Sequence, residues 1–353
     1  MNNQPEYLET LVARLRSAEW VAIDTEADSL HAYPEKLCLI QVSSPEGDEL
    51  VDPLAGLDLK PLFQALGGRE LILHGSDYDL RLLHRSGGFV PQSIFDTMLA
   101  SRLCGDLEFG LASLVKKYLG LTLEKGSQKA DWSRRPLTPK MEEYARNDTK
   151  YLKTLSDLLR VELEAKGRME WLRETCARLI VDSTHLPAEE TARERWRISG
   201  CNRLTRRGMA ILRVIWQWRE ETAIALNRPP FFVLSHDLLL TIADTASQNQ
   251  PVEPLLPPRL PHRRSLDLLQ AVETGRRVPP EDWPSALRQI SHRETETEKR
   301  RFIALKKKRD EVAAALGLDP TLIAAKAELT ALSRDKAAAP DLLMNWQRQL
   351  LLG

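Results

Sequence analysis

Three separated segments of the chain place acidic side chains directly beside apolar sequence. Asp24 and Glu26 follow an apolar, partly β-branched run, Asp79 follows a second apolar run and a Gly-Ser turn, and Asp148 lies four residues after Tyr144. An unpaired charge in apolar surroundings is costly, so these carboxylates need partners. Divalent cations held by carboxylates are one such partner, and they form the standard apparatus for phosphodiester cleavage.

The first acidic pair lies on a predicted strand over residues 19–26. Asp24 and Glu26 are two residues apart, and the side-chain period of a strand places both on one face. One divalent cation could bridge them at the point where a buried strand meets a cleft. The alternative is a pair of strand-end carboxylates that face water, which is common for an isolated Asp-x-Glu.

Tyr144 and Asp148 lie on a predicted helix that begins at Thr138-Pro139. Their spacing of four stacks them on one face of the helix, one turn apart. Such a carboxylate can bind a metal, while the phenol can hydrogen-bond an attacking water. The alternative is a tyrosine packed at the edge of the core with an aspartate near the end of a helix.

Asp79 is predicted to lie in the first turn of the helix that follows a strand at residues 71–74. A carboxylate in a first turn is stabilised by the positive N-terminal end of the helix. Capping alone would also explain an acid there, and Asp77 could equally be the cap. From the residues alone, either Asp79 or Asp77 could bind a metal.

The pattern of elements predicts several domains. Residues 1–170 read as an α/β domain, with further strands at 37–42, 49–53 and 71–74 and helices from residue 96 onward. Residues 171–202 read as a helical linker. Residues 203–283 read as an all-helical domain, and a proline-rich break separates it from a last helical unit at 286–353.

Composition narrows the class of protein. Residues 1–100 carry 7 Lys and Arg against 16 Asp and Glu, whereas residues 101–353 carry 43 against 34. This asymmetry suits a metal site joined to a surface that binds a polyanion, although ordinary variation between domains also explains it. The chain has no phosphate-binding loop, so we expect no ATP chemistry. Without a signal peptide or an apolar run of membrane-spanning length, we expect a cytoplasmic protein that does not contact membrane.

The four cysteines are too widely spaced to form a Cys-x-x-Cys pair. A thiolate zinc site and a disulfide framework are therefore not indicated. They are Cys38, Cys104, Cys176 and Cys201.

In combination and in this order, the acidic motifs resemble those of the tyrosine-bearing branch of the DEDD 3′–5′ exonucleases. The stretches Phe95–Ala100 and Lys125–Leu137 also resemble that branch. Residues 203–283 resemble the helicase-and-RNase-D C-terminal (HRDC) domain, and residues 286–353 resemble a second, more divergent copy. The arrangement resembles the bacterial ribonuclease D family over nearly the whole chain.

This resemblance implies a ribonuclease-H-like α/β domain followed by two all-α HRDC-like domains. It implies a 3′–5′ exoribonuclease that releases 5′-mononucleotides from RNA 3′ ends, such as those of tRNA precursors, and that acts as a monomer. Two divalent cations, Mg²⁺ or Mn²⁺, would be required and no nucleotide cofactor. The implied metal ligands are Asp24, Glu26, Asp79 and Asp148, with Asp24 bridging both ions and Tyr144 orienting the water.

Several polar residues near these motifs are candidate contacts for RNA, because Lys and Arg commonly neutralise phosphates. For each, a structural or solvated role is a comparable alternative. We expect Trp132 to anchor the irregular segment at 124–140. The candidates are Gln41, His74, Lys125, Gln128, Arg134 and Arg135, and, in the helical region, Arg206, Arg207, Arg263 and Arg264.

Three other functions remain open at the level of sequence. The same chemistry could act on DNA, since no residue can be identified that reads a 2′-hydroxyl. The chain could instead be a nucleic-acid-binding adaptor that lacks turnover, although none of the four acids is missing. The helical domains could bind protein and not RNA.

Overall fold

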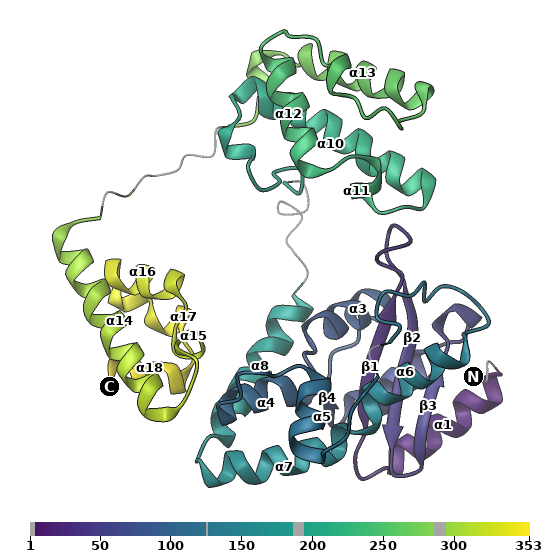
Figure 1. Cartoon of the computed structure of the whole chain (residues 1–353), viewed down its shortest axis with the longest axis vertical. Coiled ribbons are helices and arrows are strands. Elements are labelled where there is room, and N and C mark those ends of the chain that lie inside the picture. The colour runs from purple at the N-terminus through teal and green to yellow at the C-terminus, as the bar shows by residue number, and fades with distance from the viewer. Residues whose placement is uncertain (1–3, 125, 186–193, 286–291, 293) are drawn as a thin grey trace. The chain divides into compact units, whose positions relative to one another are not determined.

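The structure is a computed structural model that describes residues 4–124, 126–185, 194–285, 292 and 294–353. Residues group into two compact units. One contains most of the α/β region together with the C-terminal helices, and the other contains the helical domain around residues 194–285 and the short segment Asp28–Lys36. Figure 1 shows the elements and their labels.

A five-stranded mixed sheet forms the centre of the α/β region. Its strand order is β3-β2-β1-β4-β5. β1 pairs antiparallel with β2 and parallel with β4, while β2–β3 is antiparallel and β4–β5 is parallel. The strands are β1 (Ala22–Ala27), β2 (Leu37–Ser44), β3 (Gly47–Val51), β4 (Glu70–Leu73) and β5 (Ser93–Asp96).

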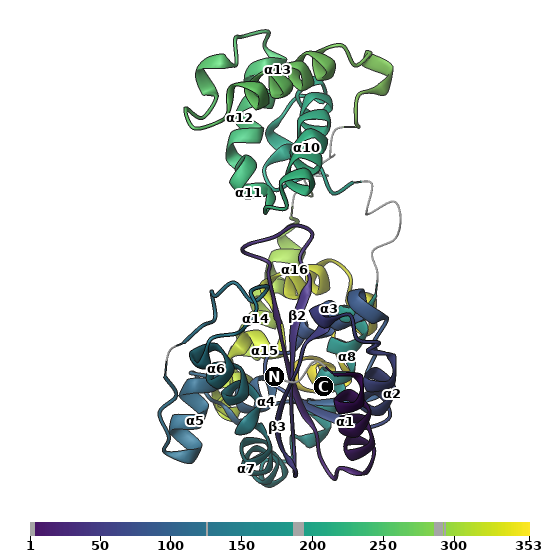
Figure 2. The same cartoon turned by 90° about the vertical axis from the view of Figure 1, so that its right-hand side faces the viewer.

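Helices cover both faces of this sheet, as Figure 2 shows. One face carries α1 (Pro5–Ser17), α2 (Lys60–Gly67) and α3 (Asp77–Gly87), and the other carries α5 (Leu111–Leu119), α6 (Pro139–Lys150) and α7 (Leu152–Ala165). α4 (Thr97–Cys104) and α8 (Met169–Thr184) complete the region. A sheet with helices on both faces buries its strands on both sides, which explains the nearly continuous apolar run of β2.

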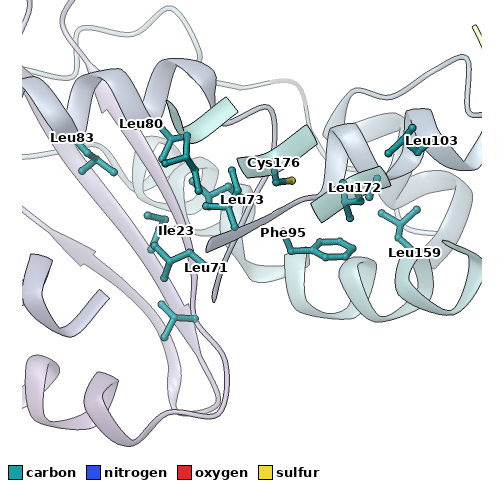
Figure 3. Close-up of a cluster of buried hydrophobic side chains, with 14 of the residues drawn as sticks. Ile23, Leu71, Leu73, Leu80, Leu83, Phe95, Leu103, Leu159, Leu172 and Cys176 are labelled. Atoms are coloured by element: carbon teal, nitrogen blue, oxygen red, sulfur yellow. The ribbon is translucent and has the colours of Figure 1, made fainter. Parts of the chain in front are cut away.

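Alternation along the strands divides the apolar side chains between these two layers. Ile23, Leu71 and Leu73 point toward Leu80 and Leu83 on α3 (Figure 3). Trp20, Ala22 and Ile72 pack with Leu152 on the α7 side. Asp24 and Glu26 share the face of Ala22, which is the α6 side of the sheet.

Helix α8 falls in the stretch expected to be a linker, yet it packs into the core of the α/β region. Its Leu172, Cys176 and Ile180 are buried. Figure 3 shows Leu172 and Cys176 beside Phe95 of β5. Residues 186–193 of the expected linker lie outside the described residues.

The C-terminal helices share this core. Trp346 stacks on Trp171 of α8, with ring centroids 5.0 Å apart and planes at 13°. Arg168 donates to the carbonyls of both Leu103 and Leu316, each at 2.7 Å. The helices are α14 (Glu296–Leu316), α15 (Pro320–Ile323), α16 (Lys326–Arg334), α17 (Ala339–Leu342) and α18 (Asn345–Leu352).

The second unit has a separate core. Ile211, Leu212 and Ile215 of the long helix α10 (Arg206–Leu226) pack with Leu239 and Leu268. The other helices are α11 (Pro230–Val233), α12 (His236–Ser247) and α13 (His262–Arg276). Short 3-10 helices lie at Pro53–Ala55, Cys201–Arg203, Glu253–Leu255, Pro280–Asp282 and Lys336–Ala338.

Within the described ranges, none of the helices is both long and apolar enough to traverse a bilayer.

Candidate active site

Strand β1 supplies the first two acids of the site. Asp24 pairs across the sheet with Gln41, and Glu26 pairs with Leu39. The register shifts between Glu26 and Ala27, directly after the second acid. Such irregularities bend a strand and re-aim its side chains, and they are common next to active sites. The prediction that Asp24 and Glu26 share one face of a strand is confirmed.

Helix α6 supplies Tyr144 and Asp148, as the sequence predicts. Thr138 caps this helix by accepting a hydrogen bond from the amide of Met141, and Pro139 occupies its first turn. α6 lies over β1, β2 and β3. The hydroxyls of Ser43 on β2 and of Thr149, which is adjacent to Asp148, share a hydrogen bond of 2.7 Å. The helix is thereby held with its acid above strand β1.

These two elements bring three carboxylates together. Asp24, Glu26 and Asp148 each offer one oxygen, and the three oxygens lie within 4.8 Å of one another. Carboxylate oxygens are the ligands that Mg²⁺ and similar hard cations use in proteins. The residues present therefore fit a divalent cation.

Asp79 reaches the site from the other face of β1. It lies in the first turn of α3, as predicted, and only 6% of it is exposed. Thr25, between the two acids of β1, points to that face and donates its hydroxyl to Asp79 at 2.5 Å. The neighbouring Asp77 is occupied by an ion pair with Arg81 at 2.6 Å and a hydrogen bond from Ser183 at 3.0 Å. This placement favours Asp79 over Asp77 as the fourth acid of the site.

Burial raises the pKa of all four acids, and the negative charge of neighbouring acids adds to each shift. Burial raises the pKa of Asp24 well above its usual range, and the charges of Asp79, Asp148 and Glu26 add to this. Burial raises the pKa of Glu26 to about 9, with further increases from Asp148 and Asp79.

The other two acids are shifted less because each accepts a hydrogen bond. Burial raises the pKa of Asp79 to about 6, and the Thr25 hydroxyl opposes the shift. Burial raises the pKa of Asp148 to about 7, and the hydrogen bond from Tyr144 opposes it. A bound cation would favour the ionised form of all four acids.

Tyr144 is held at the edge of this cluster. Its hydroxyl donates to Asp148, and its ring packs on that of Trp132 with centroids 6.1 Å apart. Burial, followed by the charges of Asp148 and other site acids, raises the pKa of Tyr144 above its usual value. Trp132 is 1% exposed, so it anchors the irregular segment as predicted.

Two candidate RNA contacts are buried within the α/β region. Gln41 is 0% exposed, so no part of it is accessible to RNA in this conformation. Among the described residues, its amide atoms have no hydrogen-bond partner. His74 is partly buried and its Nδ1 lies 2.9 Å from the Thr97 hydroxyl. Burial lowers the pKa of His74 below its usual value.

Arg135 makes structural contacts within the α/β region, and its assignment as an RNA contact stays a prediction. Its guanidinium donates to both oxygens of Asp52, at 2.7 and 2.5 Å. It also donates to the carbonyls of Cys38, Trp132 and Arg134, at 2.7, 2.8 and 2.8 Å. A guanidinium has five N–H donors, so these contacts use all of them.

The remaining candidates in the irregular segment divide by exposure. Gln128 and Arg134 are exposed, and Arg134 lies 3.5 Å from Asp131. Lys125 lies outside the described residues. Both exposed side chains are accessible to a ligand at the surface.

The two arginine pairs of the helical domain also differ in how far their side chains are exposed. Arg206 donates to the carbonyls of Trp283 and Pro284, and Arg207 donates to that of Ser247. Arg206 therefore ties a loop to helix α10, and Arg207 ties the end of α12 to it. Arg263 is exposed and Arg264 is partly exposed.

Comparison with known families agrees with this geometry. Residues 1–164 match the family model of a 3′–5′ exonuclease, and residues 209–250 match that of the HRDC domain. The chain thus joins a ribonuclease-H-like 3′–5′ exonuclease domain to an HRDC domain and a helix-rich C-terminal region.

Individual relatives of the chain are ribonuclease D proteins. Ribonuclease D of Gluconacetobacter diazotrophicus is 36% identical over 245 residues, which are 68% of this chain and 62% of that protein. Ribonuclease D of Haemophilus influenzae is 28% identical over 96% of this chain and 87% of its own length. The crystal structure of Escherichia coli RNase D, described as an exoribonuclease involved in structured RNA processing, superposes with a TM-score of 0.78 at 26% identity, covering 100% of this chain and 99% of that one.

The chain belongs to the ribonuclease D family. Its match to several curated relatives spans about six tenths of their length, such as 58% of the Bartonella henselae protein.

Proposed function

We propose that this protein is a metal-dependent 3′–5′ exoribonuclease that releases 5′-mononucleotides. The observation that carries the proposal is the cluster of Asp24, Glu26 and Asp148, whose oxygens lie within 4.8 Å of one another. Asp79 and Tyr144 complete the set, from α3 and α6. Burial opposes the charge of every acid in this set, and a bound cation would offset that cost.

The four acids would hold two divalent cations, Mg²⁺ or Mn²⁺. When bound, such cations lower the pKa of water and stabilise negative charge on a leaving oxygen. Of the four acids, Asp24 has the strongest reason to contact both ions. Burial and the charges of all three others act on it.

Tyr144 orients the attacking water in this proposal. Because the pKa of its phenol is raised, the hydroxyl remains protonated at neutral pH and cannot act as the base. It can donate to Asp148 and accept from a water, which fixes the direction of the water's lone pair. The ring contact with Trp132 limits the freedom of the phenol.

RNA 3′ ends, including those of tRNA precursors and other structured RNAs, are the proposed substrates. The relatives called ribonuclease D and the description of the E. coli enzyme support RNA over DNA. Exposed Arg134 and Gln128 lie in the segment that precedes α6 and could contact the phosphate backbone. We propose that the protein acts as a cytoplasmic monomer.

The C-terminal helices are proposed to form a second HRDC-like domain. α10 and α14 each contain 21 residues, and each is followed by a four-residue helix that begins with proline. Arg219 of α10 pairs with Glu220 and donates to the Leu234 carbonyl. Arg309 of α14 pairs with Asp310 and donates to the Ala324 carbonyl. Arg219 and Arg309, Glu220 and Asp310, and Leu234 and Ala324 are therefore counterparts. The number of residues between the two members is the same for all three pairs.

The function can be tested with matched substrates. A single-stranded RNA and the DNA of the same sequence, each labelled at its 5′ end, would be incubated with the protein and Mn²⁺. We expect stepwise shortening of the RNA and release of mononucleotides, with much slower loss of the DNA. Preferential digestion of the DNA would support a DNA exonuclease. Binding without shortening of either strand would support an adaptor without turnover.

Whether the helical domains bind RNA needs a surface substitution and not a truncation. Removing residues 203–353 would also remove Trp346 from the core that it shares with α8. Arg263→Glu with Arg264→Glu, on the accessible side of α13, leaves that core intact. If this domain binds RNA, the affinity falls and its salt dependence weakens. Unchanged affinity would favour a protein-binding role.

A further inference from the structure

Asp96, the last residue of β5, is a fully buried carboxylate with an unusually complete set of donors. It accepts hydrogen bonds from the amides of Gly75 at 3.1 Å and Ser76 at 2.8 Å, and from the Ser76 hydroxyl at 2.8 Å. It also accepts from the amides of Met98 at 2.9 Å and Leu99 at 3.1 Å. The side chain is 0% exposed.

These bonds join two parts of the chain. Met98 and Leu99 form the first turn of α4, which Asp96 caps. Gly75 and Ser76 form the turn between β4 and α3. Gly75 has φ of 67°, in the left-handed region, and a Cβ there would contact the Met98 side chain at 3.4 Å. The turn is therefore held in one conformation against α4.

The same turn determines where α3 begins. Ser76 is the residue that precedes α3, and its carbonyl accepts from the amide of Leu80 at 3.0 Å. Its hydroxyl does not cap the helix, because it donates to Asp96 instead. Asp79 follows three residues later. Each residue turns a helix by roughly a quarter of a revolution, so the placement of Ser76 sets the direction of Asp79.

We propose that Asp96 is a positioning residue for the metal site. It fixes the Gly75–Ser76 turn, and the turn aims the Asp79 carboxylate, which Thr25 holds from its other side. The inference rests on the proposed function, since it requires Asp79 to bind a cation. Outer residues that orient a ligand typically contribute 10- to 100-fold to metal affinity.

An acid suits this position for a chemical reason. An ionised carboxylate only accepts hydrogen bonds, which matches five donors. The NH₂ group of an asparagine is itself a donor and would face other donors. These would be either the groups of Ser76 or the amides of Gly75, Met98 and Leu99. Asp96→Asn keeps the size of the side chain and loses the match, so it is the sharpest variant.

The experiment measures Mn²⁺ affinity of the full chain by calorimetry without RNA, and kcat and KM on a 5′-labelled RNA. For Asp96→Asn we expect Mn²⁺ affinity to fall by about 10- to 100-fold. The kcat should fall while KM for RNA stays near that of the wild type. Asp106→Asn is the matched control, because Asp106 contacts Lys117 and Tyr118, which lie on α5 and not in the turn. It should leave Mn²⁺ affinity unchanged.

A folded Asp96→Asn protein that binds Mn²⁺ like the wild type would overturn the proposal. If that variant does not fold, Ser76→Ala decides, since it removes one of the five bonds. A few-fold loss of Mn²⁺ affinity in Ser76→Ala supports the proposal, and no loss overturns it. If the wild type itself binds no Mn²⁺, the proposed function fails together with this inference. If the wild type binds and Asp79→Asn does not, only the role of Asp96 is in question.

Discussion

The ring of Tyr144 lies directly against Gly126, so closely that a Cβ atom at Gly126 would overlap the ring. The contact joins the irregular segment before α6 to the phenol that hydrogen-bonds Asp148. Gly126 is exposed, so a larger side chain there is excluded by the ring and not by burial. The position of Tyr144 therefore depends on a glycine in a segment that has no regular structure.

Gly126→Ala should displace the Tyr144 ring and lower kcat. A misplacement of about 1 Å in a catalytic group can cost on the order of 100-fold in rate. Mn²⁺ affinity should change little, because the four acids stay in place. Gly68→Ala is the control, since Gly68 has φ of −87° and no atom within 4 Å of an added Cβ. Equal activity of the two variants would contradict the role of the contact.

Tyr144→Phe isolates the hydroxyl from the ring. The ring keeps its packing on Trp132, while the hydrogen bond to Asp148 is lost. We expect kcat to fall on the order of 100-fold, in the range of a positioned hydrogen-bonding group. Isothermal calorimetry should find Mn²⁺ affinity close to that of the wild type. A Tyr144→Phe protein that retains full kcat would show that the phenol does not orient the water.

The sequence predicts most of the strands and both helices that carry site residues, because these segments have strong apolar patterns and clear caps. Thr138 and Pro139 begin α6 as expected, and Asp79 lies in the first turn of α3. Strand β5 is missed, because Ile94 and Phe95 are its only apolar residues, and α1 is missed although its buried side chains have helical spacing. The packing of α8 is also missed, since charged residues cover its exposed side.

The acids of the site could be identified from sequence only as a set, because each motif alone has a simple structural explanation. Their approach to within 4.8 Å depends on α6 crossing β1, which no local pattern encodes. The same is true of Arg135, three of whose five acceptor atoms belong to Asp52 and Cys38, far from it along the chain. Basic residues in a loop predict RNA contacts only where tertiary structure leaves their donors free.

The buried acids should make the metal-free protein less stable as pH rises. Glu26 has a pKa raised to about 9, against about 4.3 in an unfolded chain. The folded state therefore binds more protons between these values, and its free energy of unfolding falls as pH increases through that window. Glu26→Gln cannot ionise, so its stability should exceed that of the wild type at pH 8 but not at pH 4. Thermal denaturation in EDTA measures this, and a difference that does not vary with pH would contradict it.

Bound cations should reverse this dependence. Metal binding requires ionised carboxylates, so Mn²⁺ affinity should rise from pH 6 to pH 8. The added thermal stability from saturating Mn²⁺ should therefore be larger at pH 8 in the wild type. In Glu26→Gln the increase should be smaller, because one ligand is neutral. The same denaturation series with Mn²⁺ in place of EDTA checks both expectations.

Trp346→Ala tests the attachment of the C-terminal helices. Trp346 is 3% exposed and stacks on Trp171, and Glu174 accepts from the amide of Asn345 at 2.6 Å. Truncating a buried tryptophan costs about 3–5 kcal/mol. Leu352→Ala is the control, because Leu352 is 36% exposed and such substitutions change stability by roughly 0.5 kcal/mol or less. Urea denaturation that gives both variants the same stability would contradict the shared core.

The most direct test of the proposed exoribonuclease is digestion of a 5′-labelled, 3′-extended tRNA-like RNA with Mg²⁺, Mn²⁺ or EDTA. The wild type should produce a ladder that shortens from the 3′ end with either metal and no product in EDTA. Asp24→Asn should produce no ladder, although it still binds the RNA. Digestion that persists in EDTA or in Asp24→Asn, or a wild type that binds RNA and shortens it with neither metal, would contradict the assignment.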